Sequence, residues 1–340
     1  MTALNPERIM QTGMGFWGSK VLLSAVELGL FSKLGSKSMT ASELQSALDL
    51  HPRAVPDFPD ALLAMGLLER EGDGANARYK NTPETALFLD KNSEAYMGGI
   101  LEMANDRLYG FWASLTAALR TGQPQNEVKS TGESIFAKLY AEPKRLEQFM
   151  KAMAGVSAAN FKIFAEKFDF SNYKTLTDIG GATGQLSCLV AAANDHMQCM
   201  SFDLPVVEPI ATKYIAKAGL SHRVKVVSGD FFEHDLPKAD VITMGMILHD
   251  WNLEKKKILI AKAYDALPKG GAFVAIEALI DDGRRQNAFG LLMSLNMLIE
   301  FGDAFDYTSA DFRGWCEEVG FQRFDVIQLA GPSSAAIAYK

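Results

Sequence analysis

The 340-residue sequence has few cysteines, no excess of positive charge and no long apolar run. It contains three cysteines, 34 lysines and arginines against 41 aspartates and glutamates, and a net charge of −7. Cys188, Cys199 and Cys316 are odd in number and widely spaced, which excludes a disulfide framework, and no pair has zinc-ligand spacing. We interpret them as buried apolar side chains in a reducing compartment.

The acidic composition disfavours a nucleic-acid partner, because binding to a phosphate backbone usually requires a basic surface. The apolar run over 289–299 is interrupted by Ser294 and Asn296 and is too short to cross a bilayer. The N-terminus lacks a signal-peptide pattern. We therefore expect a cytoplasmic protein that acts on small molecules and has no membrane partner.

The first half of the sequence is predicted to be mainly helical. Apolar residues recur at helical spacing over 9–34, and their stripe nearly encircles the helix. A helix of this kind must be buried, and a small domain alone would not cover it, so we predict a homodimer.

A capping box at Thr40–Glu43, a helix over 60–68 and a hairpin turn at Gly72–Gly74 follow. This order is typical of a winged helix. A packing role is favoured over DNA binding because the segment 60–70 has no positive face.

After residue 168 short apolar strands alternate with helical patterns, which predicts an α/β domain with a parallel sheet and helices on both faces. We therefore divide the chain into a mainly helical winged-helix domain, 1–168, and an α/β domain, 169–340. Strands are expected at 175–179, 197–202, 224–228, 240–246 and 272–277. Helices are expected around 96–119 and at 133–168, 184–193, 206–218, 253–267 and 287–301.

The segment Asp178-Ile-Gly-Gly-Ala-Thr-Gly184 follows the first of these strands and opens a helix. Its glycines allow a ligand to approach the backbone closely. Ala182 replaces the second glycine of the dinucleotide-binding motif, and an acid before the glycines suits a cationic ligand better than a pyrophosphate.

Acids also end the next two strands. Asp203 can accept hydrogen bonds from both hydroxyls of a ribose. Asp230, followed by Phe231, can bind an adenine amino group and ring face. Each acid alone could cap a helix, but three acids at successive strand ends favour one ligand site.

His249 ends the fourth strand, and an imidazole can take up a proton near neutral pH. A single histidine is usually structural, but this one is expected at the same edge as the acids. Glu277 ends the fifth strand and can orient the imidazole. Asp306 could return to this edge or cap the helix that begins near Thr308.

In these motifs the chain resembles the O-methyltransferases that include the plant caffeate enzymes, the hydroxyindole enzymes and many bacterial natural-product enzymes. The resemblance covers nearly the whole length. The matching segments are 178–184, 202–205, 229–231, 248–251 and 270–271, in the same order and spacing.

The resemblance implies a Rossmann-like methyltransferase domain that binds S-adenosyl-L-methionine, preceded by a winged-helix dimerisation domain. It implies that His249 is the general base, with Glu277 and Asp306 beside it, and that no metal is needed. The acid at Asp306 is shorter than in the family and lacks the arginine that follows it there. Gly245 stands where plant members have a lysine. The expected cofactor residues are Asp178, Gly180, Gly184, Asp203, Leu204, Asp230, Phe231, Met244, Trp251 and Ser157.

The expected acceptor is a small hydroxylated aromatic compound, although N-methylation is not excluded. Met246, Met293 and Met297 could line its pocket, or belong to the core, and the helical half could add Phe111, Trp112 and Phe161. Two alternatives are a methyltransferase-fold decarboxylase or hydroxylase and a cofactor-sensing winged-helix regulator. The presence of His249 favours methyl transfer.

Overall fold

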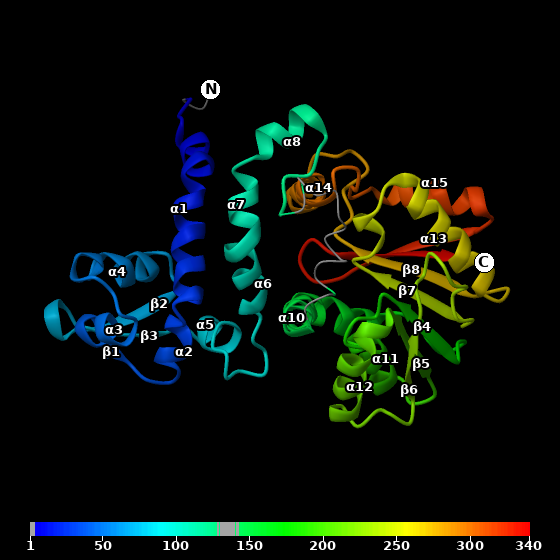
Figure 1. Ribbon diagram of the computed structural model, residues 1–340, viewed down its shortest axis with the longest axis horizontal. Helices are drawn as coiled ribbons and strands as arrows, with labels where there is room; N and C mark the ends of the chain where they lie inside the picture. The colour runs from blue at the N-terminus through cyan, green and yellow to red at the C-terminus, as the bar shows by residue number, and fades with distance from the viewer. Residues whose placement is uncertain (1–3, 128, 130–139, 141–142) are drawn as a thin grey trace. The chain divides into compact units, whose positions relative to one another are not determined.

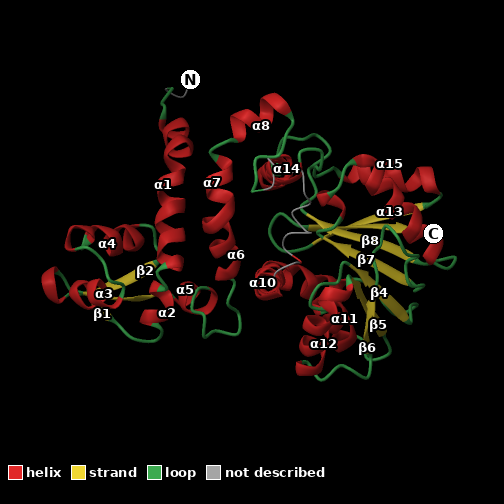
Figure 2. Ribbon diagram, viewed as in Figure 1, coloured by secondary structure: helices red, strands yellow, loops and turns green. Residues whose placement is uncertain are grey.

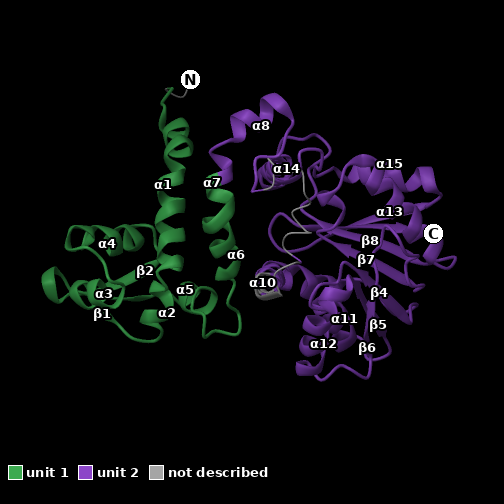
Figure 3. Cartoon of the chain, in the orientation of Figure 1, with its two compact units in different colours: residues 1–110 green, residues 111–340 purple. Residues whose placement is uncertain are grey.

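The computed structural model describes residues 4–127, 129, 140 and 143–340 (Figure 1). The chain forms two compact units, Met1–Gly110 and Phe111–Lys340, shown in green and purple in Figure 3. Within the described residues, none of the helices combines the length and apolar character that crossing a bilayer requires.

The first unit combines helices with a small antiparallel sheet of order β1-β3-β2. The order helix, helix, hairpin agrees with the winged-helix pattern expected from the sequence. Its helices are α1 Glu7–Glu27, α2 Leu30–Leu34, α3 Ala41–Ala47, η1 Pro52–Ala54, α4 Asp57–Ala64, η2 Gly74–Asn76, α5 Pro83–Phe88, α6 Gly98–Met103 and the π-helix η3 Ala104–Leu108, and its strands are β1 Met39–Thr40, β2 Leu68–Glu71 and β3 Arg78–Asn81.

Local sequence explains the ends of these elements. The helix expected over 9–34 is divided into α1 and α2 because Gly29 has φ 71°, a left-handed conformation that glycine adopts without strain. Thr40 and Glu43 form the predicted capping box at the start of α3. Gly72 and Gly74, with φ 76° and 67°, turn the chain between β2 and β3.

The second unit is built on a seven-stranded sheet of order β6-β5-β4-β7-β8-β10-β9, drawn in yellow in Figure 2. The first five strands of this order are parallel, as predicted. The strands are β4 Thr175–Ile179, β5 Gln198–Asp203, β6 Val224–Ser228, β7 Val241–Gly245, β8 Ala272–Glu277, β9 Arg323–Gln328 and β10 Ser334–Tyr339.

The antiparallel strands β9 and β10 make the sheet mixed and not purely parallel. This pair was not predicted. β10 pairs with β8, and Ala335, Ala336 and Ile337 are almost fully buried. Its small and β-branched residues match a buried strand, but the run is short and could not be distinguished from a helix segment by its pattern.

Helices cover both faces of this sheet, and each face has its own core. The core beneath α10, α11 and α12 includes Phe164 and Leu186, and the core beneath α13 and α15 includes Leu259 and Phe312. The helices after the division, with α7 crossing it, are α7 Tyr109–Trp112, α8 Leu115–Thr121, α10 Pro143–Lys167, α11 Gln185–Ala193, η4 Pro205–Val207, α12 Glu208–Lys217, η5 Leu248–Asp250, α13 Leu253–Ala266, α14 Ala288–Phe301 and α15 Ser309–Val319.

The division between the units lies earlier in the chain than the predicted boundary at 168/169. Residues 111–168 belong to the second unit because α10 packs on the sheet domain, where Phe164 and Phe168 join Leu176 and Leu186 in one core. Of the helix expected over 133–168, residues 133–139 and 141–142 lie outside the described residues.

Candidate active site

The glycine turn between β4 and α11 is compact and leaves no space for side chains. Gly180, Ala182 and Gly184 have φ 68°, 48° and 77°. A Cβ atom on Gly181 would lie 2.3 Å from the Oγ atom of Ser201, and one on Gly180 would lie 2.3 Å from Cδ1 of Ile247. Glycine at these positions therefore lets the turn pack closely against β5 and the segment that follows β7.

Asp203 at the end of β5 holds this turn in place. Its Oδ2 atom accepts a hydrogen bond from the Ala182 amide at 2.9 Å, and its Oδ1 atom accepts one from the Leu204 amide at 2.7 Å. Each carboxylate oxygen has a second lone pair, so both can still accept a hydrogen bond from a ligand. Burial raises the pKa of Asp203 to about 6, although the two amide hydrogen bonds oppose this rise.

Asp178 at the end of β4 is a second buried carboxylate beside the turn. It accepts a hydrogen bond from Thr243 Oγ1 at 2.7 Å. Burial raises its pKa to about 7; the Thr243 hydrogen bond lowers it, and the charge of Asp203 adds to the rise. Among the described residues no lysine, arginine or histidine forms an ion pair with Asp178 or Asp203, so a cationic ligand would compensate both charges.

The acids at the strand ends converge, although they are far apart in the sequence. Burial raises the pKa of Tyr140, and the charges of Asp203, Asp250 and Asp230 raise it further. Tyr140 also packs in a small cluster with Ala182, Leu146 and Val207. Tyr140 therefore lies near the glycine turn, and no sequence signal indicated this residue.

An aromatic group stands beside Asp230. Its Oδ1 atom accepts a hydrogen bond from the Phe232 amide at 2.8 Å. The rings of Phe231 and Phe232 pack edge-on against Trp251, with centroids 6.0 and 4.8 Å apart. The structure thus brings Phe231 and Trp251 together, as the resemblance implied.

Met244 does not reach this edge. It lies within β7 and is fully buried in the core on the α13 side. The next methionine, Met246, is the one at the strand end, where its sulfur receives a hydrogen bond from Ser157 Oγ of α10 at 3.6 Å. The Met244 side chain points into this core because side chains alternate along a strand, and the expected cofactor contact of Met244 stays a prediction.

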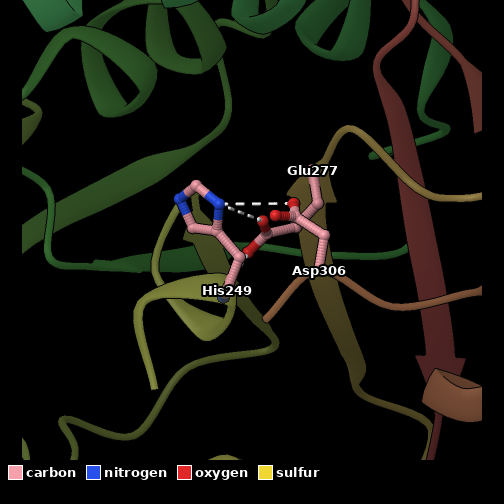
Figure 4. Close-up of side chains that lie close together, drawn as sticks. All are labelled: His249, Glu277 and Asp306. Carbon is pink, nitrogen blue, oxygen red and sulfur yellow. Dashed lines mark hydrogen bonds and ion pairs between the residues drawn. The ribbon is translucent and has the colours of Figure 1, made fainter. Parts of the chain in front are cut away.

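His249 lies in η5 between three carboxylates and is 4% exposed. Its Nδ1 atom is 3.3 Å from Asp306 Oδ1 and 3.7 Å from Glu277 Oε2, as drawn in Figure 4. Its Nε2 atom is 3.4 Å from Asp250 Oδ1, longer than a normal hydrogen bond. Two carboxylates therefore face Nδ1, whereas one faces Nε2.

Glu277 positions both the backbone and the ring of His249. Its Oε1 atom accepts hydrogen bonds from the amides of Leu248 at 3.0 Å and His249 at 3.4 Å, while Oε2 faces Nδ1. The glutamate is 2% exposed. One carboxylate at the end of β8 thus fixes the turn that follows β7, because the two strands are neighbours.

Asp306 belongs to the imidazole site and does not cap α15. Thr308 is itself the N-cap of that helix and forms a capping box with Asp311. The amide of Asp306 instead donates a hydrogen bond to Ser294 Oγ at 3.2 Å, and Asp306 is 2% exposed. The sequence left two roles open for Asp306, a place beside the imidazole and a cap of α15. The geometry agrees with the first.

These carboxylates determine the charge of the imidazole. Burial lowers the pKa of His249, but the charges of Glu277, Asp250 and Asp306 outweigh burial and raise it to about 10. Burial raises the pKa of Glu277 to about 7, although the charge of His249 lowers it. His249, Glu277 and Asp306 also offer ligand atoms within 4.8 Å of one another, a set that could hold a metal ion.

Gly245 at the end of β7 cannot carry a side chain without moving α10. A Cβ atom there would lie 2.9 Å from Cε1 of Phe161. Where the plant enzymes have a lysine, this chain therefore has an aromatic ring packed on the strand. Among the other expected pocket residues, Trp112 donates a hydrogen bond to Asn296 of α14 at 2.9 Å, and Met293 and Met297 lie on the same helix.

Comparisons with known proteins agree with this geometry. A family model described as an O-methyltransferase domain matches residues 112–322, and one described as an O-methyltransferase dimerisation domain matches residues 10–91.

The chain belongs to this O-methyltransferase family. It is 39% identical over 335 residues to the tetracenomycin polyketide synthesis 8-O-methyl transferase TcmO of Streptomyces glaucescens, with 98% of this chain and 97% of that protein covered. It is 36% identical to the N,N-dimethyltransferase OxyT of Streptomyces rimosus, with 92% and 90% covered. The structure of human N-acetylserotonin methyltransferase in complex with S-adenosylmethionine aligns with a TM-score of 0.91 and 26% identity over 100% of this chain and 99% of that one.

This O-methyltransferase depends on S-adenosylmethionine, and its residues fit that cofactor. The closed glycine turn, the paired acids Asp178 and Asp203 without a cation among the described residues, and the acid and rings at Asp230 suit a cationic nucleoside. The positive sulfonium would supply the charge that these carboxylates lack.

We expect the Asp178→Asn variant to gain stability relative to the wild type as pH rises. The folded-state pKa of Asp178 is raised from 3.8 to about 7. Its contribution to stability is therefore complete below pH 3.8 and is lost as pH rises through about 7. Urea unfolding without cofactor should show an advantage for Asn at pH 8 that is smaller at pH 5.

The control is Asp265→Asn, which changes an exposed carboxylate on α13 and should follow the wild type at both pH values. The Asp178 variant should also bind S-adenosylmethionine more weakly in calorimetry. An advantage for Asn that is equal at pH 5 and pH 8 would contradict a raised pKa at Asp178.

Proposed function

We propose that this enzyme methylates a hydroxyl group of a small aromatic acceptor and that His249 is the general base. The observation that carries the proposal is the arrangement of the imidazole: Nδ1 faces the carboxylates of Asp306 and Glu277, which leaves Nε2 for the acceptor. TcmO is named for polyketide methylation, which supports an aromatic acceptor of that kind.

The chain's own part in the reaction is to hold the acceptor and remove its proton. Bound S-adenosylmethionine supplies the electrophilic methyl group. A phenol has a pKa near that of tyrosine, about 10, and His249 has a pKa raised to about 10. Proton transfer from the acceptor to Nε2 would therefore be nearly balanced in free energy. The Nδ1–H group then donates toward Asp306 and Glu277, which stabilise the imidazolium.

We keep the ten expected residues, Met244 among them, as the proposed cofactor site. Asp203 would bind the ribose hydroxyls, Asp230 with Phe231 and Trp251 the adenine, and Asp178 the amino-acid part. The remaining positions are Gly180, Gly184, Leu204 and Ser157.

An amine acceptor is the second candidate, because OxyT, similar over 92% of this chain, is named as an N,N-dimethyltransferase. A base at Nε2 could serve an amine as well as a phenol. Mass spectrometry of products from matched phenol and aniline acceptors separates the two. Decarboxylated or hydroxylated products would instead support non-methylating use of the cofactor.

We also propose a homodimer formed through the first unit, and a cytoplasmic location. Near its N-terminus α1 presents an exposed apolar surface, with Ile9 75% and Trp17 63% exposed. A groove of about 520 Å³ continues this surface and is lined mainly by apolar residues. The match to a dimerisation domain over 10–91 supports a second copy as the occupant, and the three buried free thiols suit a reducing compartment.

We expect His249→Ala to lower kcat by about 100- to 10,000-fold, the usual contribution of a general base. Calorimetry should show unchanged affinity for S-adenosylmethionine, because His249 is not among the cofactor residues. Methyl transfer to a phenolic acceptor is the assay, and His222→Ala, which changes an exposed histidine, is the control.

Full activity of His249→Ala would refute the base assignment. Loss of wild-type activity after dialysis against a chelator, with recovery on adding a divalent metal, would instead support a metal ion held by His249, Glu277 and Asp306.

We expect kcat/KM for the acceptor to rise with pH, with the ascending limb above pH 6.5. The neutral imidazole is the base, and the surrounding carboxylates raise the pKa of His249 from 6.5 to about 10. Glu277→Gln removes one of these charges and should move the limb to lower pH while reducing kcat. The control Glu254→Gln, at an exposed position of α13, should not move the limb. A limb that stays in place in Glu277→Gln argues against Glu277 as the partner of the base.

We expect Trp17→Glu to weaken the dimer, because an unpaired charge would enter an apolar interface. A Kd increase of about 100-fold or more is expected, and analytical ultracentrifugation measures it. Val326→Glu, on the exposed face of the edge strand β9, is the matched control. A Trp17→Glu protein that sediments as the wild-type dimer would show that another surface forms the contact.

A further inference from the structure

One lysine lies entirely inside the second unit, next to the candidate active site. Lys256 belongs to α13 and is 0% exposed, whereas the next residue, Lys257, pairs with Glu318 near the surface at 2.6 Å. Burial of an ammonium group costs free energy unless its donors and its charge are compensated. The sequence offered no signal for this residue beyond its place in a lysine-rich helix.

The ammonium group of Lys256 joins the two loops that carry the proposed base and its partner. Nζ donates hydrogen bonds to the main-chain oxygens of Trp251 and, at 2.8 Å, Phe305. Trp251 closely follows His249 in the sequence, and Phe305 immediately precedes Asp306. Figure 4 shows that His249 and Asp306 approach each other from different segments of the chain. Lys256 thus connects these two segments through their main-chain oxygens.

Further contacts make this connection rigid. Nζ lies 3.7 Å from the centroid of the Phe305 ring, a cation–π contact. On the outer side, Asn252 donates a hydrogen bond to Asp303 at 2.8 Å, and this pair is more exposed. The loops are therefore joined at two points, a buried one at Lys256 and an exposed one at Asn252 and Asp303.

The charge of Lys256 faces the acids of the site. Burial lowers its pKa to about 8, while Glu277, Asp306, Asp250 and Asp303 raise it against this effect. The charge of Glu300 also raises the pKa of Asp250. The group remains largely protonated at neutral pH and is the buried cation that, with His249, offsets these carboxylates.

We propose that Lys256 is a positioning residue for His249, which keeps the two loops at the separation where Asp306 reaches Nδ1. This inference rests on the proposed base role of His249. It assigns Lys256 no contact with substrate or cofactor.

The test compares Lys256→Met, which keeps the length of the side chain but removes its charge and donors, with Lys257→Met as the matched control. In Lys256→Met we expect kcat to fall about 10- to 100-fold, as a small misplacement of a catalytic group does, with unchanged Kd for S-adenosylmethionine. The loss of kcat should be much smaller in an Asp306→Asn background, because Lys256 acts through the placement of Asp306. A lost fold or loose packing would instead lower kcat in both backgrounds.

Wild-type kcat in Lys256→Met, or an equal loss of kcat in the Asp306→Asn background, would overturn the inference. The His249→Ala variant, measured alongside, separates it from the proposed function: an active His249→Ala refutes the base, whereas an inactive His249→Ala with a wild-type Lys256→Met refutes only the role of the lysine.

Lys256→Gln serves if the methionine variant does not fold. If neither folds, the 15N resonance of Lys256 Nζ in labelled wild type and Glu277→Gln provides the answer. Its apparent pKa should fall in Glu277→Gln, and an unchanged value would count against the inference.

Discussion

The second unit depends on the burial of several carboxylates around one imidazole. Glu277, Asp306 and Asp250 all lie within 3.7 Å of a nitrogen of His249, and Glu277 and Asp306 are each 2% exposed. Each uncompensated buried charge of this kind would destabilise a fold by roughly several kcal/mol. The imidazolium and the buried Lys256 reduce this cost, and the same charges set the proton affinity on which the proposed chemistry relies.

The neighbouring ligand site follows the same principle but leaves its charge uncompensated. Asp178 and Asp203 have raised pKa values because burial penalises their ionised forms. The cationic sulfonium of the cofactor fits this position because it would restore the balance. One edge of the sheet thus contains two acidic groups of residues, one compensated from within the chain and one suited to compensation by a ligand.

Close packing at the strand ends makes this arrangement precise in space. Gly245 is covered by Phe161, Gly181 by Ser201 and Gly180 by Ile247, at distances where no side chain would fit. These contacts bring α10 and the turn after β7 against the ligand site. Helix α10 therefore belongs with the sheet, although its sequence resembles the helical first half. In the first unit, an apolar surface of α1 is exposed to solvent. This exposure agrees with the match to a dimerisation domain.

The sequence alone determined the parallel part of the sheet, the glycine turn, the strand-end acids and the histidine that follows the fourth strand, because these are local patterns of apolar period, glycine and charge. The sequence did not predict the antiparallel strands β9 and β10, since short apolar strands of this kind have no distinct period. Only the tertiary structure shows that Asp306 lies beside the imidazole and Met244 in the core. It also shows that Tyr140 lies near the glycine turn and that Lys256 connects the two loops. Each of these depends on which distant segments pack together, and a buried charge is compensated through space by groups that the order of residues does not reveal.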